Sequence, residues 1–180
     1  MLKSMLLWSD KLDKGAVGEI FSSSDLDCLS INFSSLKSLD GIGHSKKMQS
    51  VILDTCRSLE DISALAEVKD TLKALSLTSC PRVKDFTVLE ELENLEALIL
   101  SCSTTEIPSL QFLKKLKKLK VFMFTFNVLD GDITPCKDIP YVFMMRGRKH
   151  YNLKDRDLPE EKESFTRGLD GIPSWRCLSW

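Results

Sequence analysis

The stretch Leu72-Lys-Ala-Leu-Ser-Leu-Thr-Ser-Cys80 is repeated in pattern by Leu95-Glu-Ala-Leu-Ile-Leu-Ser-Cys-Ser103, which begins 23 residues later. In both segments apolar residues occupy the first, fourth and sixth positions, and a small residue occupies the ninth. The alternation of apolar and other residues favours a half-buried strand. Recurrence at this spacing predicts a solenoid, in which one short unit is stacked on the next.

The same nine-residue pattern occurs six times, with starting residues Leu26, Met48, Leu72, Leu95, Leu119 and Ile139. Its fourth and sixth positions give six expected strands with the core pairs Leu29/Ile31, Val51/Leu53, Leu75/Leu77, Leu98/Leu100, Phe122/Phe124 and Val142/Met144. Its ninth position holds Ser34, Cys56, Cys80, Ser103, Asn127 and Gly147. A small polar side chain turned inward there can hydrogen-bond the backbone that leaves the strand.

A second apolar series with a spacing of three follows several of the strands, as in Leu59, Ile62 and Leu65. Such a spacing is compatible with 3₁₀ turns or short α-helices. Residues 62–70, 86–94 and 109–118 are rich in Leu, Glu and Lys and are expected to be helical. The segment 40–44 contains two glycines and is expected to be a loop.

On these patterns, residues 26–127 resemble leucine-rich repeats of the short type with 22 to 24 residues, as in internalin-like and phosphatase-regulator-like proteins. The resemblance implies an α/β solenoid, curved, with about six parallel strands on the concave face and short α or 3₁₀ helices on the convex face. It implies caps at both ends, a bacterial source and a protein-binding role. We expect one domain, with an N-terminal cap at 1–25, repeats at 26–147 and a C-terminal cap or tail at 148–180 packed on the last repeats.

The composition is ordinary for a globular protein, with 43% hydrophobic and 28% charged residues among 180. A formal net charge of −1 gives no general attraction to nucleic acid or anionic membranes. The apolar run of residues 5–8 is too short for a signal peptide, and no run approaches the roughly 18 residues that span a bilayer. We therefore expect a cytoplasmic protein whose six cysteines are mostly free thiols.

Side chains that alternate with the core pairs should form the exposed concave face of the sheet. Large apolar groups on such a face usually mark a contact surface, and Tyr, Phe, Met and Arg are typical anchors. The predicted partner-binding residues are Val121, Met123, Phe126, Tyr141, Phe143, Met145, Arg146, Ile99, Ile52 and Asp54. An equally weighted alternative is that the C-terminal tail covers the apolar end of this face, with Trp175 or Trp180 docked there.

No catalytic set or metal site stands out. The only two histidines, His44 and His150, are far apart and no CxxC pair is present, which disfavours zinc. A set of His150 with Asp155, Asp157 and Cys177 has no supporting spacing, so a solvated histidine is the preferred interpretation. The lysine-rich run 114–120 is interpreted as the solvated outer face of the convex side.

We therefore expect a non-enzymatic protein-binding module without cofactor or metal. The most concrete hypothesis is a cytoplasmic inhibitor of the immunity type, which binds and neutralises one folded protein, such as a toxin, through its concave face. A scaffold or regulatory subunit of a multiprotein complex is the alternative, and a hydrolase or ligase is a remote one. We expect no nucleic-acid or membrane partner, and a monomer when the protein is free.

Overall fold

The computed structural model describes residues 4–8 and 26–159 of the chain. Strands and 3₁₀ helices alternate along this part of the sequence. The strands are β1 (Ser4–Trp8), β2 (Cys28–Asn32), β3 (Ser50–Asp54), β4 (Ala74–Thr78), β5 (Ala97–Ser101), β6 (Glu106–Ile107), β7 (Val121–Phe124), β8 (Asn127–Val128) and β9 (Tyr141–Met144). The 3₁₀ helices are η1 (Ile42–His44), η2 (Ser63–Val68), η3 (Thr87–Glu91), η4 (Gln111–Lys115), η5 (Thr134–Asp138) and η6 (Asp155–Asp157).

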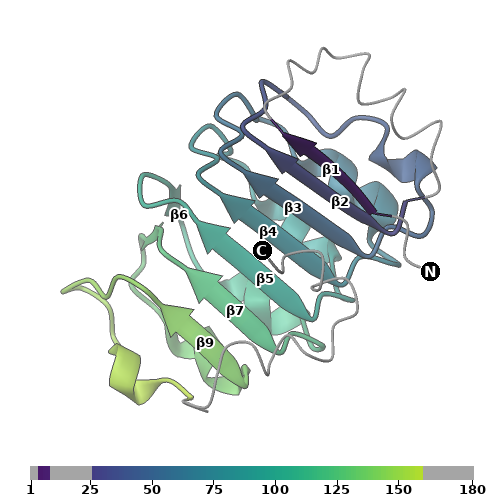
Figure 1. Ribbon diagram of the computed structural model, residues 1–180. Helices are drawn as coiled ribbons and strands as arrows, with labels where there is room; N and C mark the ends of the chain where they lie inside the picture. Colours follow the sequence, from purple (N-terminus) through teal and green to yellow (C-terminus); the bar gives the residue numbers. More distant parts are fainter. Residues whose placement is uncertain (1–3, 9–25, 160–180) are drawn as a thin grey trace.

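One parallel sheet of seven strands runs through the molecule in the order β1-β2-β3-β4-β5-β7-β9 (Figure 1). Neighbouring strands pair in register, so that equivalent residues of successive repeats are partners: Leu29 lies beside Val51, and Leu75 lies beside Leu98. This register confirms the six core pairs expected from the sequence. It also places equivalent residues of successive units in straight columns across the sheet.

The sheet has one strand more than the six expected. Residues 4–8 pair in parallel with β2, with Met5 beside Leu29 and Leu7 beside Ile31. The sequence holds the reason, because Leu2, Met5 and Leu7 occupy the first, fourth and sixth positions of the same pattern. Part of the segment expected only to cap the first repeat therefore extends the sheet.

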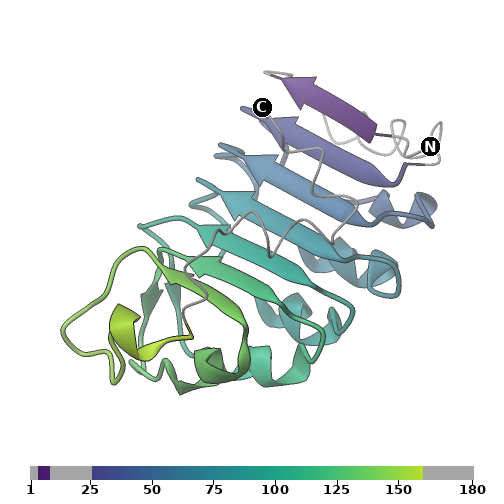
Figure 2. The same ribbon diagram turned by 60° about the horizontal axis from the view of Figure 1, so that its bottom comes forward.

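The core lies between the sheet and the layer of 3₁₀ helices, and the helices lie on the outer side of the bend (Figure 2). One continuous cluster of buried apolar side chains extends from Leu26 to Leu158. Segments 62–70, 86–94 and 109–118 each contain a helix, as expected, and each is a short 3₁₀ helix. The expected loop at 40–44 was wrong in part, because 3₁₀ helix η1 begins at Ile42 and packs on η2. No helix of the described residues is long and apolar enough to span a membrane.

Aspartates fix the start of three of the 3₁₀ helices, a feature that the sequence reading missed. Each carboxylate accepts a hydrogen bond from the amide two residues later, which is the geometry of an Asx turn. The pairs are Asp61 and Ser63 (2.8 Å), Asp85 and Thr87 (2.9 Å), and Asp132 and Thr134 (3.0 Å). The amide hydrogen bonds at Asp61 and Asp85, and the Thr134 hydroxyl and amide at Asp132, lower the pKa of all three carboxyl groups.

The ninth position of the repeat turns inward in the first three units of the pattern. Ser34 accepts a hydrogen bond from a backbone amide two residues on, and the Cys56 and Cys80 thiols point at carbonyl oxygens of the preceding strands at 3.7 and 3.8 Å. Both thiols are buried and reduced. A hydrogen bond with Cys56, together with burial, raises the pKa of Cys80. The expectation was wrong for Ser103, which is exposed.

The repeats change character after β5. A second parallel pair, β6 with β8, forms beyond the carboxyl ends of β5 and β7. Residues 148–159 then fold back onto the last repeats, with Tyr151 and Leu158 buried. The Tyr151 hydroxyl accepts a hydrogen bond from the Val128 amide at 3.0 Å and donates one to the Phe126 carbonyl at 3.2 Å. This segment is therefore held against the chain around β8.

Candidate protein-binding surface

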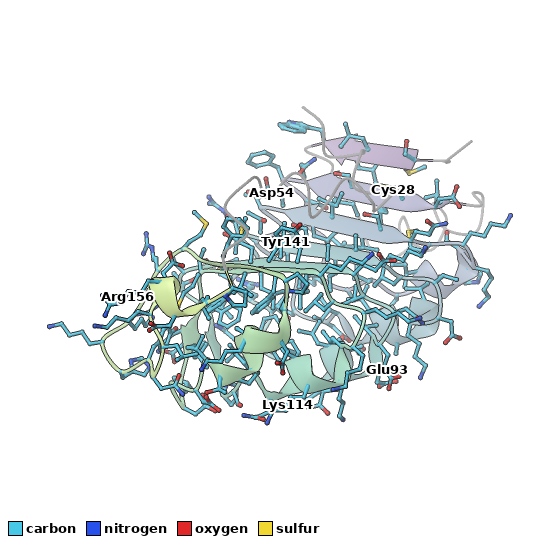
Figure 3. The ribbon with its side chains drawn as sticks, turned by 90° about the horizontal axis from the view of Figure 1, so that it is seen from below. Cys28, Asp54, Glu93, Lys114, Tyr141 and Arg156 are labelled. Atoms are coloured by element: carbon cyan, nitrogen blue, oxygen red, sulfur yellow. The ribbon has the colours of Figure 1, made fainter. Side chains whose placement is uncertain are left out.

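The predicted columns of the concave face are present in the sheet. The central column runs Ser30, Ile52, Ser76, Ile99, Met123 and Phe143 in the pairing register. The column beside it runs Cys28, Ser50, Ala74, Ala97, Val121 and Tyr141. Figure 3 shows Asp54 and Tyr141 on the side of the sheet away from the 3₁₀ helices.

Much of this face is not exposed, which corrects the sequence expectation. Ile52 is 4% exposed, Ile99 is 8% exposed and Val121 is fully buried. Val121 forms a small apolar cluster with Ala74 and Ala97 of the same column, and Tyr141 packs against that cluster. The column that contains Val121 therefore contributes packing between strands. Ile52, Ile99 and Val121 have little exposed surface for contact with a partner.

Phe126 was placed on the wrong face. It is 1% exposed and belongs to the core, where its ring lies 5.2 Å from the ring of Phe124, which in turn lies 5.1 Å from that of Phe122. The reason is the backbone after the strand. In earlier units the equivalent residues Phe33 and Thr55 adopt a positive φ of 56° and 54°, whereas Phe126 does not. The chain after β7 therefore keeps the alternation of an extended strand, which turns Phe126 inward.

Five of the six remaining predicted residues form what we call the C-terminal patch: Met123, Tyr141, Phe143, Met145 and Arg146. Met123, Tyr141 and Phe143 are half-buried, whereas Met145 is 64% exposed and Arg146 is exposed. Met123 and Phe143 are paired neighbours on β7 and β9. The patch thus combines apolar surface with a guanidinium group at one edge, a composition typical of protein interfaces.

Asp54 ends β3 on the same face and is half-buried. Its carboxylate accepts a hydrogen bond from the Thr55 hydroxyl at 2.9 Å. Asp54 lies three strands away from β7 in the sheet, so it belongs to a different part of the concave face than the C-terminal patch.

The lysine-rich run on the convex side is paired with the preceding repeat. Lys115 lies 2.6 Å from Glu90, and Lys120 lies 2.6 Å from Glu96. Hydrogen bonding to Glu90, and its charge, raise the pKa of Lys115. Figure 3 shows Lys114 and Glu93 together on this outer surface. Carboxylates of the preceding repeat therefore pair with two of the five lysines of the run.

His150 is exposed, as expected from the sequence, and its side chain is also anchored. Its Nε2 lies 2.9 Å from the Val128 carbonyl oxygen, and its ring meets that of Tyr151 edge-on at 4.8 Å between centroids. The proposed companion Cys177, and the tail tryptophans Trp175 and Trp180, lie outside the described residues. Within residues 4–8 and 26–159, no three His, Cys, Asp or Glu side chains gather as a metal site requires.

The sequence reading missed a cleft at the edge of the sheet where the strands end. Its volume is about 410 Å³, and it extends from Arg57, after β3, to Met145 and Arg146, after β9. We call it the arginine cleft; Ser101, Thr104 and Thr125 also line it. Arg57 and Arg146 are far apart in the sequence and become neighbours of one cleft only because the parallel strands end at the same edge. The sequence did contain a signal for this cleft, because Arg57 and Arg146 each follow an expected strand by two or three residues.

Comparison with known proteins supports the fold. No protein-family model matches the chain, and no curated protein matches its sequence. An internalin from Listeria monocytogenes matches the structure with a TM-score of 0.60 and 13% sequence identity, over 78% of this chain and 41% of the internalin. A leucine-rich-repeat protein from Leptospira interrogans matches with a TM-score of 0.44 and 20% identity, over 79% of this chain and 48% of that protein.

This chain therefore spans less than half the length of either protein. At 13% identity the internalin match bears on the fold alone. It agrees with the parallel sheet, the in-register columns and the 3₁₀ layer described above. The chain has the leucine-rich-repeat fold, with the curved parallel sheet of a short-repeat solenoid.

Proposed function

We propose that this protein is a non-enzymatic binding module that holds one folded protein partner through the C-terminal patch. The observation that carries the proposal is the gathering of Met123, Phe143 and Met145 around the last two strands, with Met145 64% exposed. Exposed apolar groups next to an arginine are typical of interface centres. The small, buried side chains in the middle of the sheet then serve as a smooth floor beside this patch.

The more specific role that we propose is that of a cytoplasmic inhibitor of the immunity type, in a bacterium. Such a protein needs a rigid surface that is complementary to one partner and needs no chemistry of its own. A continuous core with in-register strands supplies that rigidity. A net charge of −1, with Lys115 and Lys120 of the convex side paired to glutamates, favours a partner that is recognised by shape and apolar contact over a polyanion.

The test is affinity capture from the native host, with the wild-type protein and with single alanine variants of Met123, Phe143 and Met145. Phe33→Ala is the matched control, because Phe33 is 50% exposed but lies after β2, at the other end of the sheet. The captured protein should be lost or strongly reduced with the patch variants and retained with Phe33→Ala. Equal capture by all variants would remove the proposed surface.

A scaffold or regulatory subunit is the second candidate, and the stoichiometry of the complex distinguishes the two. An inhibitor should form a complex with one partner and abolish that partner's activity. A scaffold should bind two different proteins at the same time and leave their activities in place. Sedimentation velocity of the purified complex, with an activity assay of the captured protein, decides between these roles.

A further inference from the structure

The arginine cleft carries positive charge that no described residue neutralises. Arg57 and Arg146 both line it, both are exposed, and neither forms an ion pair with any residue that the structure describes. Some other basic side chains are paired, such as Arg82 with Glu60 at 3.0 Å. No carboxylate of the described residues lines the cleft. The site therefore holds two positive charges and no negative one.

Residues with hydroxyl groups make up half of those that line the cleft. Ser101, Ser103, Thr104 and Thr125 come from two neighbouring units and add hydrogen-bond donors between the two arginines. The side chain of Thr125 is the most informative, because the residue is only 8% exposed and its hydroxyl has no hydrogen-bond partner among the described residues. An unpaired buried hydroxyl is unfavourable, so this group favours a bound acceptor.

We propose that the arginine cleft is a binding site for a phosphate monoester. Such a group carries about two negative charges at neutral pH and three strong acceptor oxygens, which complements two guanidinium groups and several hydroxyls. Arginine is suited to this task because its planar fork of donors matches phosphate oxygens. The inference goes beyond the proposed function: the cleft shares Met145 and Arg146 with the C-terminal patch, but its other lining residues, among them Arg57 and Thr125, lie outside that patch.

Cys102 supplies a built-in reporter for the site. It lines the cleft and is partly exposed, whereas Cys28, Cys56, Cys80 and Cys136 are buried. Burial acts to raise the pKa of the Cys102 thiol. Hydrogen bonds with Thr104 and Thr105 outweigh the effect of burial, so the pKa is lowered. The rate of alkylation of Cys102 should fall when a ligand fills the cleft.

The experiment is a titration of the whole chain, in a Cys177→Ser background, with inorganic phosphate at constant ionic strength. Amide shifts in two-dimensional NMR spectra and the rate of Cys102 alkylation are followed. We expect saturable shifts centred on residues 101–104 and slower alkylation. In Arg57→Gln and in Arg146→Gln the affinity should fall roughly tenfold or more, because hydrogen bonds to charged groups are lost.

Arg156→Gln is the matched control, because Arg156 is 79% exposed and paired with Asp157, away from the cleft. It removes the same charge from the protein and should leave the affinity unchanged. The proposal is overturned if no saturable shift occurs at the cleft, if Arg156→Gln weakens binding as much as the cleft variants, or if acetate binds as well as phosphate. Thermal melts confirm that each variant is folded.

Two further arms identify the source of the phosphate group. Tighter binding of O-phosphoserine than of inorganic phosphate would indicate a phosphorylated protein side chain, and tighter binding of ribose 5-phosphate would indicate a small sugar phosphate. Both results support a phosphate monoester site. Binding should also weaken between pH 7.5 and pH 5, because the second ionisation of a phosphate monoester lies near pH 6. Equal affinity at both pH values would contradict a preference for the dianion.

Discussion

Removal of one hydroxyl group, by Tyr151→Phe, tests how residues 148–159 are held on the last repeats. The hydroxyl lies between two backbone groups, accepting from the Val128 amide at 3.0 Å and donating to the Phe126 carbonyl at 3.2 Å. Tyr151 is 7% exposed, so water does not readily replace these hydrogen bonds. The neighbouring amides of Asn127 and Leu129 donate to the carbonyl oxygens of Thr105 and Ile107, whereas the Val128 amide donates to the tyrosine hydroxyl.

The expected cost of Tyr151→Phe follows from this geometry. A buried donor that loses its partner costs about 1–3 kcal/mol, so we expect the free energy of unfolding to fall by about 2 kcal/mol. For a chain of this length such a loss lowers the melting temperature by roughly 4–8 °C. Urea unfolding followed by circular dichroism gives the free energy, and hydrogen exchange of the Val128 amide should become faster.

Thr87→Val is the matched control, since its hydroxyl bonds only to the exposed carboxylate of Asp85. Its effect should stay within about 0.5 kcal/mol, as for other surface substitutions. If Tyr151→Phe costs no more than this control, or if exchange at Val128 does not change, the reasoning about the cap is refuted.

Three other variants probe the fold. Gly131→Ala should cost about 2 kcal/mol or more in urea unfolding, because Gly131 has φ +71° and an added Cβ would lie 2.6 Å from a backbone oxygen; a neutral result would contradict the described turn. Ser50→Ala should raise stability by up to about 1 kcal/mol, because the Ser50 hydroxyl is buried without a partner and the next two units carry alanine in that column. A loss of stability would show that the hydroxyl has a partner. The last prediction concerns acid unfolding. The carboxyl groups of the three Asx turns have pKa values below their ordinary range when folded, so their contribution is present above pH 4 and is lost as the pH falls through the folded pKa. We therefore expect a smaller loss of stability between pH 4 and pH 2 in the combined variant Asp61→Asn, Asp85→Asn and Asp132→Asn. An unchanged slope of stability against pH would show that these carboxyl groups do not cause the loss.

The fold was predictable because the pattern of apolar residues repeats at nearly constant spacing. A one-residue shift in any unit would turn its core pair to solvent, so the pairs such as Leu75 and Leu77 fix the register. The strand at residues 4–8 was equally predictable, since Leu2, Met5 and Leu7 follow the same pattern. It was missed because the segment after it, 9–25, does not continue the pattern in the way the later units do.

The candidate surface was less predictable, because it depends on backbone geometry after each strand. Phe33 and Phe126 occupy equivalent positions in the sequence pattern, but only Phe33 has a positive φ and faces outward. Propensities do not distinguish these two cases, because Phe rarely adopts a positive φ at all. The arginine cleft was hidden for a related reason, since it arises where loops from distant units meet.

Binding of the captured partner by two aspartate variants tests the central claim most directly. Met145→Asp places a charge in the C-terminal patch, where Met145 is 64% exposed in the native protein. Leu129→Asp places the same charge at another exposed apolar residue, since Leu129 is 52% exposed. Isothermal titration calorimetry with the purified partner should show roughly tenfold or weaker affinity for Met145→Asp and unchanged affinity for Leu129→Asp. Unchanged affinity for Met145→Asp, or an equal loss for both variants, would contradict a partner held at the C-terminal patch.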